Sequence, residues 1–88
     1  MLLQLFVYSA GEGLIVNTSL CEWPYPELPI IGDSVDIEAL EKSGFKLNFR
    51  SDALKEQHFK NMRATVKSRE FTMTTDGKPF LFMYLYLD

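Results

Sequence analysis

Cysteine and histidine are the side chains most often used for nucleophilic and acid–base catalysis, and this chain contains one of each, Cys21 and His58. A Cys–His pair requires both side chains in contact, with a donor for the developing oxyanion, and the sequence around neither residue indicates one. One thiol and one imidazole also cannot fill the four positions of a structural zinc site. We therefore interpret both as packed or solvated side chains, and predict no metal site and no cofactor.

Paired carboxylates are a second source of chemistry. The pairs Asp33/Asp36 and Glu38/Glu41 have the spacing of helix caps or solvated acids rather than of a general acid and base. The stretch "DSVDIE" lacks the alternating oxygen ligands and central glycine of a calcium loop, and no phosphate-binding glycine motif occurs. The sequence therefore predicts a protein with no catalytic residues, which is not an enzyme.

Basic and aromatic residues near the C-terminus form the one pattern with functional character. Arg63, Lys67 and Arg69 have even spacing, which on a strand puts them on one face, with Tyr84 and Tyr86 predicted beside them. Such a face could bind single-stranded nucleic acid through phosphate contacts and base stacking. The favoured interpretation is a solvated strand face on which the Arg and Lys stems pack over the Tyr rings.

Charge is divided unevenly along the chain. Residues 1–41 contain seven acidic and no basic side chains, whereas residues 42–88 contain nine basic and five acidic ones, giving net charges of −7 and +4. The favoured interpretation is that the two halves fold together and that their charges meet or are solvated. The alternative is a basic face for an anionic partner.

The N-terminal elements are predicted from apolar alternation and turn residues. Residues 2–9 and 14–21 form two strands joined by the glycine-containing turn "AGEG" at 10–13. The following stretch, "WPYPELPIIGDSVDI", contains three prolines and a Gly-Asp step, which predicts a rigid corner with Trp23 and Tyr25 packed over one end of the sheet.

A short strand at 34–37, followed by a helical turn over "EALEKSG", is expected next. The competing interpretation begins a helix in this region, with Asp33 or Asp36 as its N-cap and Gly44 as its stop. Alternation of Phe45, Leu47 and Phe49 then predicts a half-buried strand at 45–51. A helix of about ten residues follows within 51–62, capped by Ser51.

The C-terminal third predicts a long hairpin about Asp76-Gly77, because this dipeptide favours a two-residue type I′ turn. In that register Thr74 faces Pro79 and Glu70 faces Met83. A carboxylate among core residues is costly, so a β-bulge near 68–70 is expected to reset the alternation. The predicted core side of the last strand consists of Leu81, Met83, Leu85 and Leu87.

The first and last strands are apolar on both faces, which is typical of strands inside two layers. The predicted fold is therefore one α+β domain over residues 1–88. It is mostly antiparallel, with about five strands in a small barrel-like or strongly curved sheet and one or two short helices. The helices are too short to cover both faces, so a second copy or another protein is expected to bind the aromatic side. The predicted contact residues are Phe6, Tyr8, Phe82 and Tyr84.

These patterns predict a small interaction module of the adaptor, inhibitor or immunity type, which self-associates or docks on a protein partner. The alternative is a single-stranded nucleic-acid binder using Arg63, Lys67, Arg69 and Tyr86. The N-terminal run "MLLQLFVYSAGEG" has no basic residue and is too short for a membrane span or signal peptide. With a single cysteine, the expected location is the cytoplasm.

Overall fold

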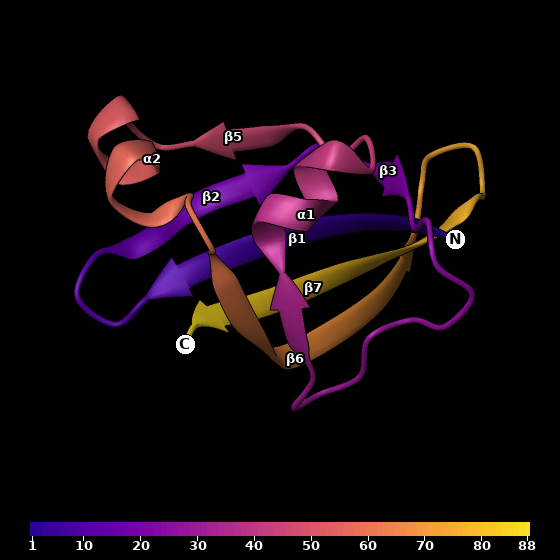
Figure 1. Cartoon of the computed structure of the whole chain (residues 1–88). Helices are drawn as coiled ribbons and strands as arrows, with labels where there is room; N and C mark the ends of the chain where they lie inside the picture. The colour runs from indigo at the N-terminus through magenta and orange to yellow at the C-terminus, as the bar shows by residue number, and fades with distance from the viewer.

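The first and last strands of the chain lie side by side at the centre of one curled sheet (Figure 1). The computed structural model describes all 88 residues. Its strands are β1 (Leu2–Ser9), β2 (Gly13–Thr18), β3 (Cys21–Glu22), β4 (Ser34–Asp36), β5 (Leu47–Phe49), β6 (Arg63–Met73) and β7 (Pro79–Leu87). Its helices are α1 (Ile37–Lys42) and α2 (Asp52–His58). The prediction of a strongly curved, β-rich fold with short helices is therefore confirmed.

The strand number and the purely antiparallel pairing were wrong. Seven strands form the sheet in the order β4-β6-β7-β1-β2-β5, with β3 paired to β1. The strands β1 and β7 are parallel, in register from Leu2 opposite Phe80 to Tyr8 opposite Tyr86, whereas every other pair is antiparallel. This arrangement puts the two most apolar strands at the centre, where each has a neighbour on both sides.

One face of the sheet forms the core. On the central strands, Leu3, Leu5 and Val7 of β1 and Leu81, Met83 and Leu85 of β7 are all at most 1% exposed. Both helices contribute to this core, through Ile37 and Leu40 of α1 and Leu54 of α2. The helices therefore cover the same face of the sheet, and the opposite face of β1 and β7 is left without a helix.

The predicted N-terminal hairpin is present, but its second strand is divided. The strand β2 pairs with β1 as far as Asn17 opposite Phe6, and β3 resumes the pairing with Leu2 and Leu3. Between them the Thr18 hydroxyl accepts the Leu5 N–H at 3.0 Å, so the interruption leaves that donor paired.

The proline-rich corner leads into both elements predicted for residues 34–44, a strand and a helix. Asp36 ends β4 and caps α1, because its carboxylate accepts the Ala39 N–H at 3.0 Å. Trp23 anchors the corner. Its indole N–H donates to the Glu27 carbonyl at 2.7 Å, and its ring meets Phe45 edge-on at 6.1 Å. Tyr25 contacts Trp23 but is half exposed.

The second helix is shorter than predicted. Ser51 caps α2 as expected, with its hydroxyl accepting the Leu54 N–H at 3.2 Å. The helix ends at His58, and Asn61 follows with a φ of 58°, a left-handed conformation that a continuing helix does not contain. Met62 is buried, as the helical spacing implied, but it lies in the connection to β6.

The C-terminal hairpin is present, but its register differs by one residue from the prediction. A type I′ turn needs positive φ at both central residues, and here Gly77 has a φ of 85° while Asp76 does not. Thr74 donates to the Lys78 carbonyl at 2.8 Å and its own carbonyl accepts the Gly77 N–H at 3.0 Å. The loop is therefore a three-residue turn with a glycine bulge, and Pro79 faces Met73.

The observed register keeps the Glu70 carboxylate out of the core, where the predicted register would have placed it. The carboxylate lies opposite Phe82, on the face away from the helices, instead of opposite Met83. A β-bulge is present, but it lies between Val66 and Ser68, at Lys67. This bulge turns Val66 and Ala64 back toward the core, where both are fully buried.

Candidate functional site

The face of the sheet opposite the helices carries a row of aromatic rings on β1 and β7. The parallel register puts Phe6 beside Tyr84 and Tyr8 beside Tyr86, with Phe82 one step along. We call this set the aromatic face. All four residues predicted as partner contacts lie in it: Phe6, Tyr8, Phe82 and Tyr84.

The rings of the aromatic face contact one another across the two strands. Phe6 stacks on Tyr84 with a centroid distance of 5.3 Å and meets Phe82 edge-on at 5.5 Å, and Tyr8 stacks on Tyr86 at 5.6 Å. Phe80 continues the row at 4.9 Å from Phe82 but is nearly buried. Because each ring is held by its neighbours, the surface is ordered before any partner arrives.

The aromatic face is only partly shielded from solvent. Phe6, Tyr8, Phe82 and Tyr84 are half-buried, and Tyr86 is 43% exposed. Their counterparts on the helix side of the same strands are at most 1% exposed. Two central strands that are fully covered on one side and half covered on the other form a rigid, apolar surface with Tyr hydroxyls for hydrogen bonding.

The predicted basic stripe does not lie on one face. Arg69 is opposite Met83 on the helix side, whereas Arg63 shares the other face with Thr65, which is opposite Tyr86. The bulge at Lys67 separates the two arginines, because it reverses the alternation between them. Tyr86 therefore has Arg63 on its face but not Arg69.

Both arginines also have partners inside the chain. Arg69 donates to the Pro29 carbonyl at 2.8 Å and lies over the Phe71 ring at 5.5 Å. Arg63 is 3.5 Å from the Asp36 carboxylate. Lys67 alone of the three points into solvent without a charged partner.

Cys21 and His58 lie at opposite ends of β1. Cys21 pairs with Leu3, and His58 contacts the turn that follows Ser9. Six residues of strand separate these ends, a distance of about 20 Å. The thiol and the imidazole therefore do not form a nucleophile–base pair in this fold.

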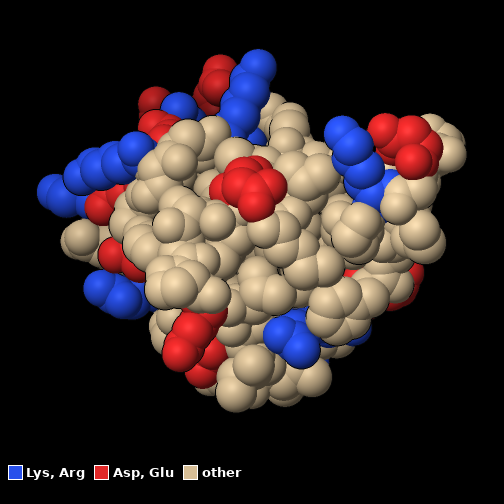
Figure 2. Space-filling view, turned by 90° about the vertical axis from the view of Figure 1, so that its right-hand side faces the viewer, with Lys and Arg blue, Asp and Glu red and all other residues tan.

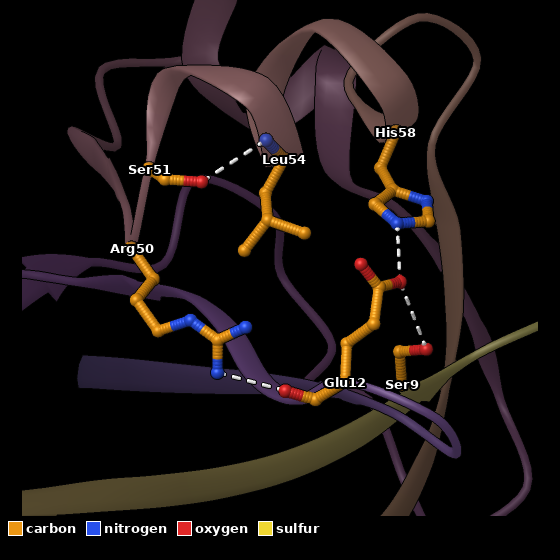
Figure 3. A network of polar contacts seen from close by, with 6 residues as sticks. All are labelled: Ser9, Glu12, Arg50, Ser51, Leu54 and His58. Atoms are coloured by element: carbon orange, nitrogen blue, oxygen red, sulfur yellow. Dashed lines mark hydrogen bonds and ion pairs between the residues drawn. The ribbon is translucent and has the colours of Figure 1, made fainter.

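His58 belongs instead to a polar network that the sequence did not indicate (Figure 3). Its Nε2 lies 2.8 Å from Glu12 Oε1, the Ser9 hydroxyl donates to the same oxygen at 3.4 Å, and Arg50 donates to the Glu12 carbonyl at 2.7 Å. In a serine triad the imidazole lies between the hydroxyl and the carboxylate, whereas here the carboxylate lies between the other two. The arrangement holds α2 and the end of β5 against the β1–β2 turn.

A groove of about 330 Å³ lies beside the proline-rich corner. Its lining includes the Trp23–Tyr25 pair and three acidic residues, Glu27, Asp33 and Asp36. The carboxylates of Asp33 and Asp36 accept backbone N–H groups, from Ile30 and Ala39 respectively. These two carboxylates therefore hold the corner and cap α1.

No group of three or more His, Cys, Asp or Glu side chains is placed to hold a metal ion. Neither helix has the length and apolar composition needed to cross a membrane.

The fold defines a small β-rich domain in which a curled mixed sheet has helices on one face and aromatic rings on the other. Comparisons with protein-family models, curated proteins and solved structures give no match to this chain. Its function is therefore inferred from its own surfaces, of which the aromatic face is the most distinctive.

Proposed function

We propose that this protein is a non-enzymatic interaction module that docks on a protein surface, or on a second copy of itself, through the aromatic face. The observation that carries the proposal is the contiguous row of half-exposed rings on the two central strands, with no helix over them. Phe and Tyr are enriched at the centres of protein interfaces because each buries a large area with few rotatable bonds.

The position of the rings favours binding over a purely structural role. Central strands are the least mobile part of a sheet, so rings fixed on them lose little conformational freedom on association. A module of the adaptor, inhibitor or immunity type needs such a surface and no catalytic group. The lone cysteine fits a reducing compartment, and we place the protein in the cytoplasm.

The proposal is tested by removing two rings and comparing the result with an equal loss of apolar surface elsewhere. We expect Tyr8→Ser with Tyr84→Ser to weaken association at least about tenfold, because hot-spot aromatic residues carry most of an interface's affinity. Ile30→Ser with Ile31→Ser is the matched control, since both side chains are more than half exposed and lie in the corner, outside the aromatic face. Light scattering and pull-down from the native host measure self-association and partner capture.

Circular dichroism first establishes that both variants are folded. Equal partner capture by the tyrosine variant and the isoleucine variant would contradict the proposal. A wild-type chain that neither self-associates at about 100 μM nor captures a partner sensitive to the tyrosine changes would also contradict it.

A further inference from the structure

The outer edge of β6 is only partly covered. Its neighbour β4 pairs with Arg63, Ala64 and Thr65, and the segment before β4 adds two hydrogen bonds to Val66. From the bulge at Lys67 to Met73, no strand lies on the side of β6 away from β7. Natural proteins blunt or cover such edges, because their free N–H and C=O groups bind other strands.

The free backbone groups can be assigned from the hairpin register. Thr74 and Lys78 form a hydrogen-bonded pair, so the direction of the peptide groups alternates from there along β6. Thr72, Glu70 and Ser68 bond to β7, whereas Met73, Phe71 and Arg69 direct their N–H and C=O groups outward. Pro79, which has no N–H, faces Met73 as this assignment requires. No other backbone group bonds to the three outward residues.

Two side chains along this edge are apolar and exposed, whereas Lys67 and Glu70 are exposed charged residues. Phe71 is 61% exposed and Met73 is 63% exposed. Arg69 is turned back toward its own chain by its hydrogen bond to the Pro29 carbonyl. Figure 2 shows the end of the molecule with the β6–β7 turn and the proline-rich corner, where an acidic group lies near the centre and further acidic and basic groups lie around it. The charged residues of this edge, Lys67, Arg69 and Glu70, restrict the registers in which it can pair.

We propose that this edge of β6 pairs with the same edge of a second copy, antiparallel, with Phe71 opposite Phe71 of that copy. In this register Arg69 pairs with Met73 of the other copy, and Met73 pairs with Arg69 of the other copy. Each of the three residue pairs then forms two hydrogen bonds. Every outward N–H and C=O group of Arg69, Phe71 and Met73 has a partner in this register. Glu70 faces Thr72 of the other chain.

Other registers would also pair the outward residues of one copy with outward residues of the other. Like charges or the end of β6 at Met73 exclude them. A shift of one pair toward the N-terminus puts Glu70 opposite Glu70, and a further shift puts Arg69 opposite Arg69. Like charges directly opposite each other destabilise a strand pair. A shift toward the C-terminus puts Arg69 opposite the turn residue Thr75, where no strand is present. Only the register centred on Phe71 uses every free group without such a conflict.

The dimer extends the function proposed above. A two-fold axis through an antiparallel strand pair runs perpendicular to the sheet, so both aromatic faces lie on the same side of one continuous sheet. Two copies would thus present two partner-binding surfaces in one direction. Binding to a partner with two matching sites then gains from the second, intramolecular contact.

The first test removes one outward N–H. In Phe71→Pro the internal ladder with β7 is preserved, because Phe71 does not donate to β7, but the central pair of the dimer loses both its bonds. Phe71→Leu is the matched control, since it keeps the N–H and an apolar side chain. We expect sedimentation to show a dimer for the wild type and Phe71→Leu, with a dissociation constant raised at least about tenfold in Phe71→Pro.

The second test reads the register and does not depend on the proline variant folding. In a Cys21→Ala background, Phe71→Cys places two thiols on paired residues about 5.5 Å apart at Cα, within disulfide range. Met73→Cys places them four residues apart along the strands, at about 13 Å. We expect mild oxidation to cross-link the first variant and not the second.

Three outcomes would overturn the inference: a wild-type monomer at about 100 μM, a folded Phe71→Pro variant that dimerises like the wild type, or equal cross-linking at positions 71 and 73. The tyrosine variant of the aromatic face separates this inference from the proposed function. A dimer lost with Tyr8 and Tyr84 but kept in Phe71→Pro would assign self-association to the aromatic face.

Discussion

At the scale of single residues, Glu12 joins three parts of the chain. It lies in the turn between β1 and β2, its side chain contacts His58 of α2, and its carbonyl accepts Arg50 beyond the end of β5. The imidazole and the carboxylate are both largely shielded, at 17% and 30% exposure, so their contact is less screened than a surface ion pair.

A double-mutant cycle measures this contact. We expect His58→Ala and Glu12→Ala to couple by about 0.5–1.5 kcal/mol in the free energy of unfolding, the usual worth of a hydrogen bond in a folded protein. Urea denaturation provides the four free energies. Lys60→Ala, at an exposed position near His58, is the control and should leave stability nearly unchanged. Additive single changes would show that the contact between the His58 and Glu12 side chains does not contribute to stability.

At the scale of elements, the β6–β7 turn depends on one backbone conformation. Gly77 has a φ of 85°, and a methyl group added there would meet no atom closer than 4.0 Å, the Met73 methyl. Any cost of a side chain at this position therefore comes from the left-handed backbone rather than from a clash. Gly11 gives the contrast, since it has open space around it and no positive φ.

The two glycines form a matched pair. Gly77→Ala should lower the free energy of unfolding by about 1–2 kcal/mol, the cost of the left-handed conformation for an L-residue. Gly11→Ala should leave stability unchanged or raise it by less than about 1 kcal/mol, by restricting the unfolded chain. Urea denaturation of both variants makes the comparison. Equal effects at the two positions would mean that the turn conformation does not limit stability.

At the scale of the whole molecule, the acidic and basic halves of the chain meet in the fold. Arg63 pairs with Asp36, and His58 meets Glu12, in each case joining the C-terminal half to the N-terminal half. Arg69 likewise bonds to the backbone of the acidic half at Pro29. Arg63–Asp36 is the one Lys or Arg to carboxylate pair among these contacts and is exposed, so the charges of the two halves are mostly solvated.

A nucleic-acid binding assay tests the alternative that Arg63, Lys67 and Arg69 bind an anionic partner. We expect no salt-sensitive affinity for single-stranded DNA or RNA, and little change in self-association when Arg63→Ser, Lys67→Ser and Arg69→Ser are combined. The physical reason is that the three side chains do not share a face. Fluorescence anisotropy between 50 and 200 mM salt measures binding, where each phosphate contact contributes about 0.7 to the logarithmic slope. A micromolar affinity with such a slope, lost in the triple variant, would support the alternative function.

Local patterns in the sequence were enough to predict both hairpins, the N-cap of α2 at Ser51, and the short strand followed by a helix at 34–44. Each of these features depends on residues a few positions apart. The aromatic face was predictable for the same reason, since alternation along one strand determines which side chains share a side. A bulge in β6 was also predicted, near 68–70 and to keep Glu70 out of the core, whereas the bulge lies at Lys67 and the register of the turn positions Glu70.

The tertiary structure decided the rest. Whether β1 pairs with β7 in parallel depends on how two distant strands share one core, and nothing local in either strand encodes that choice. The turn at Gly77 moved the register by one residue, and that step changed which face Arg69 and Glu70 occupy, because side chains alternate with a period of two. The sequence determined the strands and their apolar sides. Long-range pairing alone decided which residues meet across them, since those contacts form only when the whole core packs.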